Sequence, residues 1–329
     1  MRDGVRDMAF TVVSLGGPVA AEGEDIFRAA GVRSLSTGPY PKKEEVIALL
    51  RDSAAEAIIV RLVERVDAEI LRASPRLKVI AKHGAGTNDI DVAAAAELGV
   101  PVLAAVGANA HSVAEHALAL MLGLAKELRS QDAFVRGGGW EKKAYGGREL
   151  RGSVLGLVGI GQIGRAFAAM AEPLGMSTIA FDPFAPEEAF GPHARRVATL
   201  EALLEASDVV SLHCPLTPAT ENLIGAREIG LMKKSAFLIN TARGEVVDEA
   251  ALVAALRAGR IAGAGLDSFA PEPPAAENPL WSLPNVLVSP HIGGVTPEAR
   301  REVSLMTCRN VLSLLRGEAL APRFFVRPR

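Results

Sequence analysis

Three side chains in the second half of the sequence could together act on a carbonyl compound: Arg243, Glu272 and His291. Histidine can donate or accept a proton near neutral pH, and a neighbouring glutamate raises the proton affinity of an imidazole and fixes its tautomer. Arginine presents parallel N–H groups that match a carboxylate and can polarise a carbonyl oxygen. These residue types supply the proton donor and the cation that hydride transfer between a nicotinamide and a carbonyl carbon requires.

A glycine turn could bind the cofactor for such a reaction. The segment Gly159-Ile160-Gly161-Gln162-Ile163-Gly164 follows an apolar run and opens a helical pattern, which is the setting of a dinucleotide-binding turn. Gly159 permits the tight turn, Gly161 lets the backbone approach a pyrophosphate, and Gly164 lets the helix pack on the strand. The N-terminus of that helix would present its free N–H groups to the phosphates.

Asp182 bears on the choice of cofactor. It ends the next apolar run after the glycine turn, where a carboxylate reaches the ribose hydroxyls of adenosine. Because a carboxylate there repels a 2′-phosphate, the sequence favours NAD over NADP. The alternative is a glycine-rich turn without a ligand, in which Asp182 caps a helix.

The three polar side chains also have structural interpretations. Arg243 could be an ordinary salt-bridge partner, Glu272 a solvated loop charge, and His291 a structural histidine. All three, however, follow predicted strands of one domain, and open α/β sheets bind ligands at the carboxyl ends of their strands. We therefore interpret them jointly as a catalytic set.

Apolar runs alternate with helical patterns along most of the chain, which predicts an α/β fold with parallel sheets covered on both faces. In the first half, strands are predicted at residues 10–13, 57–60 and 77–80. The pattern restarts after residue 150 and suits a complete dinucleotide-binding domain. The strands predicted there are residues 154–158, 177–181, 209–212, 236–239, 262–266 and 286–288.

Two long helical patterns complete the prediction. One covers residues 112–135, with Ser112 as N-cap and Glu115 completing a capping box. Its Ala/Leu/Met-rich face is too apolar for solvent, so we expect it to bridge the domains and to form the contact of a homodimer. The last helix begins at Thr296-Pro297 and ends near Arg316, where Gly317 can close it.

Composition excludes several classes of partner. The 329 residues carry a formal net charge of −2, which gives no electrostatic reason to bind nucleic acid or an anionic membrane. Residues 1–10 lack the apolar stretch of a signal peptide, and no segment has the apolar length of a transmembrane helix.

Cys214 and Cys308 make no disulfide framework, so a cytoplasmic protein is expected. No metal site is expected, because no cluster has metal-ligand spacing.

Ordered blocks over nearly the whole chain resemble the D-isomer-specific 2-hydroxyacid dehydrogenases, a family that includes D-3-phosphoglycerate, glyoxylate/hydroxypyruvate and D-lactate dehydrogenases. The blocks are residues 84–91, 109–116, 159–164, 213–217, 240–244, 266–269, 272–273 and 290–294. The resemblance implies a Rossmann NAD-binding domain, residues 105–292, inserted into a discontinuous flavodoxin-like substrate domain, residues 1–104 and 293–329. It also implies reversible reduction of a small 2-keto acid by NADH, with hydroxypyruvate, glyoxylate or phosphohydroxypyruvate as the expected substrate.

The resemblance also implies roles for single residues. Arg243 would bind the substrate carboxylate and polarise the C2 oxygen, while His291 would be the acid/base and Glu272 its partner. The implied substrate contacts are Lys82, Ala85, Gly86, Asn109 and Arg243. The implied cofactor contacts are Gly159, Gly161, Gln162, Ile163, Gly164, Asp182, Cys214, Pro215, Thr241, Ala242, Asp267, Gly293 and Gly294, with Asp267 on the nicotinamide carboxamide. His83 could contact substrate and His116 could be a core or interface residue; both roles stay open.

Other interpretations remain. A formate or phosphite dehydrogenase would share the scaffold, although the formate-oxidising relatives have glutamine where this chain has Glu272. A non-catalytic NAD(H) sensor resembling the C-terminal-binding corepressors would hold the cofactor without turnover. Because the chain ends soon after its last helix, the regulatory domain of some phosphoglycerate dehydrogenases is not expected.

Overall fold

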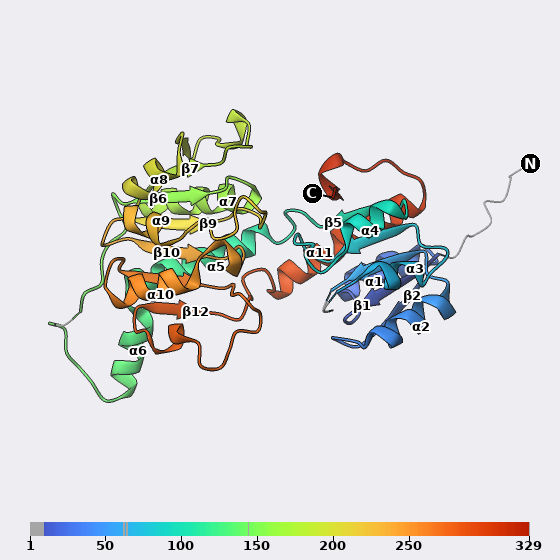
Figure 1. The fold of residues 1–329 in the computed structure, drawn as a ribbon, viewed down its shortest axis with the longest axis horizontal. Helices are drawn as coiled ribbons and strands as arrows, with labels where there is room; N and C mark the ends of the chain where they lie inside the picture. The colour runs from blue at the N-terminus through green and yellow to red at the C-terminus, as the bar shows by residue number, and fades with distance from the viewer. Residues whose placement is uncertain (1–9, 62, 64, 144, 329) are drawn as a thin grey trace, which may run out of the picture. The chain divides into compact units, whose positions relative to one another are not determined.

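The computed structural model describes residues 10–328, apart from residues 62, 64 and 144. The signal-peptide prediction falls almost entirely on residues 1–9, which lie outside the described residues. Contacts divide the chain into two compact units (Figure 1): residues 1–109 with 295–329, here unit 1, and residues 110–294, here unit 2. The chain passes between the units at 109/110 and 294/295, whereas the sequence placed these crossings at 104/105 and 292/293.

Unit 1 is built on a six-stranded sheet in the order β13-β5-β4-β3-β1-β2. Strands β1 to β5 are parallel to their neighbours in this sheet, and β13 pairs antiparallel with β5. The order 2-1-3-4-5 of the parallel strands is that of flavodoxin. The strands are β1 (Thr11–Leu15), β2 (Arg33–Ser36), β3 (Ala57–Val60), β4 (Val79–Lys82), β5 (Val102–Ala104) and β13 (Phe325–Val326).

Successive residues of the central strands of unit 1 enter two apolar cores, one on each face of the sheet. In β3, Ile58 and Val60 join one core, while Ala57 and Ile59 join the other. This alternation follows from the twofold repeat of a strand, and it requires helices on both faces. The helical elements are α1 (Ala21–Ala29), α2 (Lys43–Ser53), α3 (Ala68–Arg72), α4 (Val92–Glu97), α11 (Pro297–Leu315) and the 3-10 turn η5 (Pro322–Phe324).

The predicted ends of the last helix are confirmed. Thr296 is the N-cap of α11, and its hydroxyl accepts a hydrogen bond from Ala299 N at 3.2 Å. Pro297 occupies the first turn, where its missing N–H costs nothing. Gly317 follows the helix with φ 75°, a left-handed conformation that glycine adopts without strain.

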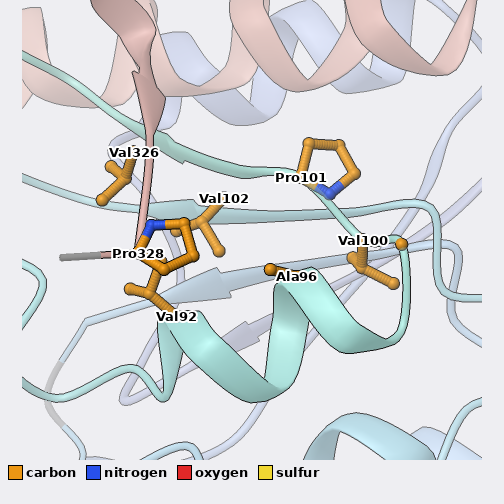
Figure 2. Close-up of a pocket in the computed structure, with 8 residues that line it drawn as sticks. Val92, Ala96, Val100, Pro101, Val102, Val326 and Pro328 are labelled. Carbon is orange, nitrogen blue, oxygen red and sulfur yellow. The ribbon is translucent and has the colours of Figure 1, made fainter.

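An apolar hollow of about 230 Å³ lies between α4 and β13 at the edge of the unit 1 sheet (Figure 2). No ionisable side chain lines it, so it offers nothing for acid/base or charge-based chemistry. Its lining residues are Val92, Ala96, Gly99, Val100, Pro101, Val102, Val326 and Pro328.

Unit 2 is built on a seven-stranded parallel sheet in the order β12-β11-β10-β9-β6-β7-β8. Numbered from β6, this is the Rossmann order 3-2-1-4-5-6 with β12 added at one edge, and it confirms the predicted fold class. The order reverses beside β6, which is where such sheets bind ligands. The strands are β6 (Val154–Val158), β7 (Ser177–Phe181), β8 (Arg195–Arg196), β9 (Val209–Leu212), β10 (Phe237–Asn240), β11 (Gly263–Leu266) and β12 (Val286–Val288).

Helices connect these strands and cover both faces. One face is covered by α5 (Ala110–Ala125), whose Ala114, Ala117 and Met121 are fully buried in a core shared with Phe167 of α7. This core packing fixes α5 against the sheet. The other helical elements are α6 (Leu128–Arg136), α7 (Gln162–Ala171), α8 (Leu200–Ala206), α9 (Ala226–Leu231), α10 (Glu249–Arg257), η1 (Glu172–Leu174), η2 (Glu187–Ala189), η3 (Gly244–Val246) and η4 (Pro279–Ser282).

The single helix predicted over residues 112–135 is wrong, because the structure divides it into α5 and α6. Glu127, between the two, takes a left-handed conformation with φ 51°. Contacts with a distant segment hold the break: Lys126 Nζ donates to Arg148 O at 2.8 Å, and Gly146 N donates to the Glu127 carboxylate at 3.4 Å. The helical period is present on both sides of the break, but these tertiary contacts override it.

The predicted N-cap of that helix is also wrong. α5 begins at Ala110, so Ser112 lies inside the helix. Its hydroxyl donates to Gly293 O at 2.6 Å instead of capping the first turn. Ser112 is therefore a link between α5 and the loop after β12.

The described part of the chain contains no helix with the length and apolar character that crossing a membrane would need.

Candidate active site

The glycine turn joins β6 to α7 and leaves space for a ligand. Gly159 has φ 97°, and a Cβ there would lie 2.8 Å from His213 C and O, so only glycine fits. Gly161 faces open space, and no side chain caps the helix that it precedes. The free N–H groups of this helix end suit a pyrophosphate, so the turn fits NAD. Of the other predicted contacts, Gln162 is exposed, Ile163 is half-buried, and Gly164 packs against Gly159 O.

Asp182 directly follows β7 and touches the glycine turn. Its Oδ2 accepts from Ile160 N at 3.1 Å, and its Oδ1 accepts from Phe184 N and Ala185 N at 3.0 and 3.1 Å. An ionised carboxylate has about four acceptor positions, so these three bonds leave capacity for a ribose hydroxyl. The carboxylate thus holds the loop while still facing the cofactor turn.

The predicted adenine side follows β9. Cys214 is half-buried, and burial raises the pKa of its thiol to about 11, so the thiol stays protonated and is a poor nucleophile. Pro215 is exposed beside it. His213 Nε2 lies 2.9 Å from Ser211 Oγ, and burial lowers the pKa of this histidine to about 3. His213 is therefore a neutral residue that supports the turn.

His291 and Glu272 form a direct pair. His291 Nδ1 lies 2.7 Å from Glu272 Oε2, while Glu272 Oε1 accepts from Phe269 N at 3.0 Å. Burial alone would raise the pKa of Glu272, but the hydrogen bonds from His291 and Phe269 N, with the charges of His291 and Arg243, lower it. The carboxylate is therefore ionised at neutral pH and engages Nδ1, which leaves His291 Nε2 for a substrate.

The backbone of His291 is unusual for a residue with a Cβ. Its φ is 54°, in the left-handed region that costs a non-glycine residue about 1–3 kcal/mol. Such strain persists only where surrounding contacts enforce it, and it clusters at functional sites. The left-handed turn of His291 is therefore held by its neighbours.

Arg243 follows β10 and lies close enough to Glu272 for its charge to lower the pKa of that carboxyl group. A close backbone approach makes this possible: a Cβ on Gly244 would lie 2.0 Å from Phe269 C, so only glycine fits. Arg243 Nη1 donates to Ala242 O at 2.6 Å. Within the described residues it forms no salt bridge, so its guanidinium charge is not neutralised by a paired carboxylate.

The remaining predicted contacts in unit 2 lie at the same strand ends. Thr241 is buried, and its hydroxyl has no hydrogen-bond partner among the described residues, as expected of a group awaiting a ligand. Asp267, directly after β11, is buried and accepts from Ile292 N and Gly293 N at 2.9 and 2.8 Å. Gly294 follows and is half-buried.

The predicted substrate contacts of unit 1 lie at the end of β4 (Lys82), in the loop after it (Ala85 and Gly86) and after β5 (Asn109). Lys82 pairs with Asp89 through Nζ and Oδ2, so its charge is largely neutralised within the unit. Ala85 is exposed, while Gly86 and Asn109 are half-buried. His83 Nε2 lies 2.7 Å from Ser304 Oγ, and burial, with the nearby Arg61 charge, lowers the pKa of this histidine to about 3. His83 is therefore neutral.

Sequence reasoning missed two features. Arg61 directly follows β3, is half-buried, and has its pKa lowered by burial and by Arg300. Its place after a strand could have drawn attention to it.

The second missed feature is Ser289, which lies between His116 and Asp267. No local pattern predicts its contact with His116, because the two residues are 173 positions apart. No group of three or more metal-binding side chains occurs among the described residues.

Residues 118–293 match a family model described as the D-isomer specific 2-hydroxyacid dehydrogenase, NAD binding domain. The chain belongs to this family. The match covers most of unit 2 and identifies it as the NAD-binding domain, which confirms the predicted family and cofactor.

Relatives agree with this assignment. A D-3-phosphoglycerate dehydrogenase of Archaeoglobus fulgidus is 38% identical over 301 residues, which are 91% of this chain and 56% of that protein. This chain thus spans about half the length of that relative. A hydroxypyruvate reductase of Thermotoga maritima is 41% identical over 82% of this chain and 87% of its own. The crystal structure of a glyoxylate reductase from Paecilomyes thermophila superposes with a TM-score of 0.85 at 32% identity, covering 97% and 99% of the two chains.

Proposed function

We propose that this chain is an NAD-dependent D-2-hydroxyacid dehydrogenase that reversibly reduces a small 2-keto acid. The observation that carries the proposal is the His291–Glu272 pair, 2.7 Å apart, with the guanidinium of Arg243 nearby, which forms no salt bridge within the described residues. These groups supply a proton donor and a carboxylate-binding cation at the strand ends of an NAD-binding domain.

The proposed roles follow from the contacts. Bound NADH supplies the hydride. Arg243 binds the substrate carboxylate and polarises the C2 oxygen through its N–H groups. Glu272 holds His291 through Nδ1, so that Nε2 delivers a proton to the C2 oxygen during reduction and accepts it during oxidation. Asp267 is the proposed partner of the nicotinamide carboxamide, and the other predicted cofactor contacts keep the roles given above.

Unit 1 is proposed to complete substrate recognition. The backbone of Ala85 and Gly86, with Lys82 and Asn109, is proposed to contact the substrate. Hydroxypyruvate, glyoxylate and phosphohydroxypyruvate are the proposed candidates. The names of the phosphoglycerate, hydroxypyruvate and glyoxylate enzymes among the relatives support this set.

The test is the loss of NADH absorbance with four acids: hydroxypyruvate, glyoxylate, pyruvate and phosphohydroxypyruvate. We expect turnover with hydroxypyruvate, glyoxylate or phosphohydroxypyruvate. We also expect a slower rate with NADPH, because the Asp182 carboxylate, bonded to the glycine turn at Ile160 N, would repel a 2′-phosphate. Tight NADH binding without turnover of any keto acid would contradict the proposal and favour a non-catalytic NAD(H) sensor.

We also propose that the protein is a homodimer, with its contact on α6 and the loop that follows. The apolar residues of α5 are largely buried within unit 2, whereas α6 has no buried residue. Large apolar side chains on this surface stay exposed: Leu128 by 57%, Phe134 by 43%, Val135 by 50%, Trp140 by 82% and Tyr145 by 45%. Large exposed apolar side chains of this kind suit a subunit contact better than solvent.

Light scattering after size-exclusion chromatography tests the dimer. We expect twice the chain mass for the wild type, and the monomer mass when Val135 and Trp140 are both replaced by glutamate. Phe184→Glu is the matched control, because Phe184 is 91% exposed on a different loop and should leave the mass unchanged. A monomeric wild type would overturn the proposal.

A cytoplasmic location is proposed as well. It rests on the two cysteines, Cys214 and Cys308, which are free thiols as expected in a reducing compartment.

A further inference from the structure

A chain of three side chains in unit 2 runs from helix α5 to the loop that carries His291. His116 Nε2 lies 2.7 Å from Ser289 Oγ, and Ser289 Oγ lies 2.6 Å from Asp267 Oδ1. His116 Nε2 is also 3.4 Å from the same carboxylate oxygen. These three side chains come from α5, the end of β11 and the start of the loop after β12. Their hydrogen bonds therefore connect three elements that are distant in the sequence.

The protons of this chain can be assigned. Burial alone would raise the pKa of Asp267, but hydrogen bonds from His116, Ser289, Ile292 N and Gly293 N lower it, so the carboxylate is ionised and only accepts. The single hydroxyl proton of Ser289 is therefore directed to Asp267. Ser289 Oγ then accepts from His116, which requires a proton on His116 Nε2.

Asp267 in turn holds the segment that contains His291. Its Oδ1 accepts from Ile292 N and its Oδ2 from Gly293 N, while Ser289 binds it from the other side of His291. Every one of these contacts is to a residue within two positions of His291. The left-handed backbone of His291, φ 54°, thus lies between two anchors on one buried carboxylate.

Helix α5 contacts the loop after β12 through the face that carries Ser112 and His116. Ser112 and His116 are four residues apart and share one face of the helix. Ser112 Oγ donates to Gly293 O at 2.6 Å, and a Cβ on Gly293 would lie 3.3 Å from the His116 ring. The loop therefore packs tightly against the helix face that carries both residues.

We propose that His116 and Ser289 are positioning residues, which orient Asp267 and through it hold His291 in its left-handed turn. The inference rests on the proposed acid/base role of His291. Neither residue touches the His291 imidazole, so they act through Asp267 and the backbone. A misplacement of about 1 Å at a reacting group can cost about 10²-fold in rate, which sets the scale of the expected effect.

The first test compares substitutions of His116. His116→Leu removes the Nε2 donor, and we expect kcat to fall on the order of 10-fold to 100-fold. The KM of the keto acid should change little, because Arg243 is not part of the hydrogen-bonded row His116–Ser289–Asp267. His116→Gln places an amide donor at a similar reach and is expected to recover most of the loss. His111→Leu is the matched control: His111 is on the same helix but is 76% exposed, so kcat should not change.

The second test asks whether the two residues act in series. Ser289→Ala removes one oxygen atom and is expected to lower kcat by a similar factor. Because His116 and Ser289 contact each other and the same Asp267 oxygen, the double variant His116→Leu/Ser289→Ala should lose clearly less than the product of the two single losses. Losses that multiply would mean independent roles and would overturn the inference.

A readout without turnover separates this inference from the proposed function. The chain has six histidines, so the His291 Cε1 proton can be assigned by substitution in an NMR spectrum. We expect its chemical shift to move in His116→Leu and Ser289→Ala and to stay in place in His116→Gln and His111→Leu. If the wild type reduces no keto acid but the signal moves in this way, the proposed function fails and the positioning role stands.

The opposite result is equally decisive. Normal turnover in the wild type, with unchanged kcat and an unchanged His291 signal in both donor-deleting variants, would overturn the positioning role and leave the proposed function intact. If His116→Leu does not fold, Ser289→Ala alone carries both comparisons, because it deletes a single atom from a half-buried side chain.

Discussion

Replacing His291 by alanine is expected to lower kcat for keto-acid reduction by roughly 10²- to 10⁴-fold, the usual contribution of a positioned acid/base. The substitution removes the ring nitrogen that would deliver the proton to the C2 oxygen. Binding of NADH should survive, because the glycine turn, Asp182 and Thr241 lie on other loops. The measurement is kcat from NADH absorbance at saturating keto acid, together with the Kd of NADH from its fluorescence.

A second histidine provides a matched control. His193 Nδ1 lies 2.7 Å from Glu172 Oε2, the same contact and distance as in the His291–Glu272 pair. It follows η2 in the same unit and has no proposed catalytic role. His193→Ala should therefore leave kcat unchanged. Near-normal kcat in His291→Ala would refute the acid/base role, whatever the behaviour of the control.

Features that depend on local sequence could be predicted. The glycine turn needs glycines at fixed spacing, because Gly159 has positive φ and a Cβ on Gly164 would lie only 2.5 Å from Gly159 O. The cap of α11 needs a hydroxyl three residues before the amide that it accepts from, and Thr296 provides it. Parallel strands that are buried on both faces leave continuous apolar runs, so the order of elements was visible as well.

Features that depend on contacts between distant residues could not be predicted from the sequence. The helix break at Glu127 is held by Arg148 and Gly146, which have no sequence relation to it. Strand β8 consists of two exposed arginines and carries no apolar alternation. The Ser289–His116 contact requires the fold before it can be recognised. Period and propensity describe neighbours along the chain, and these features are set by neighbours in space.

The candidate site shows both cases in one place. Residue type at predicted strand ends predicts Arg243, Glu272 and His291 as a catalytic set. The Arg243 loop can lie close to Glu272 only because Gly244 has no Cβ. A Cβ there would collide with the backbone of Phe269, which precedes Glu272. The fold therefore explains why these three loops meet, which residue types alone cannot do.

Replacing Arg243 by alanine is the second large expected effect. The guanidinium would bind the substrate carboxylate through two parallel N–H groups, and a hydrogen bond to a charged group contributes about 1.5–3 kcal/mol. The loss of two such bonds corresponds to a fall of roughly 10²- to 10⁴-fold in kcat/KM. Because Arg243 would also polarise the C2 oxygen, we expect kcat to fall as well as KM to rise, with the Kd of NADH unchanged.

Comparing Arg243→Lys with Arg243→Ala separates the contribution of the positive charge from that of the guanidinium geometry. Arg243→Lys keeps the positive charge near Glu272 but loses the planar fork, so its kcat/KM is expected to lie between those of the wild type and Arg243→Ala. Arg257→Ala, on the exposed end of α10, is the control for removing an arginine from this unit. If Arg243→Lys matches the wild type, charge alone suffices and the forked contact is wrong. If Arg243→Ala changes the Kd of NADH but not the KM of the keto acid, the residue belongs to the cofactor site, because a substrate carboxylate ligand must appear in the KM of the acid that it binds.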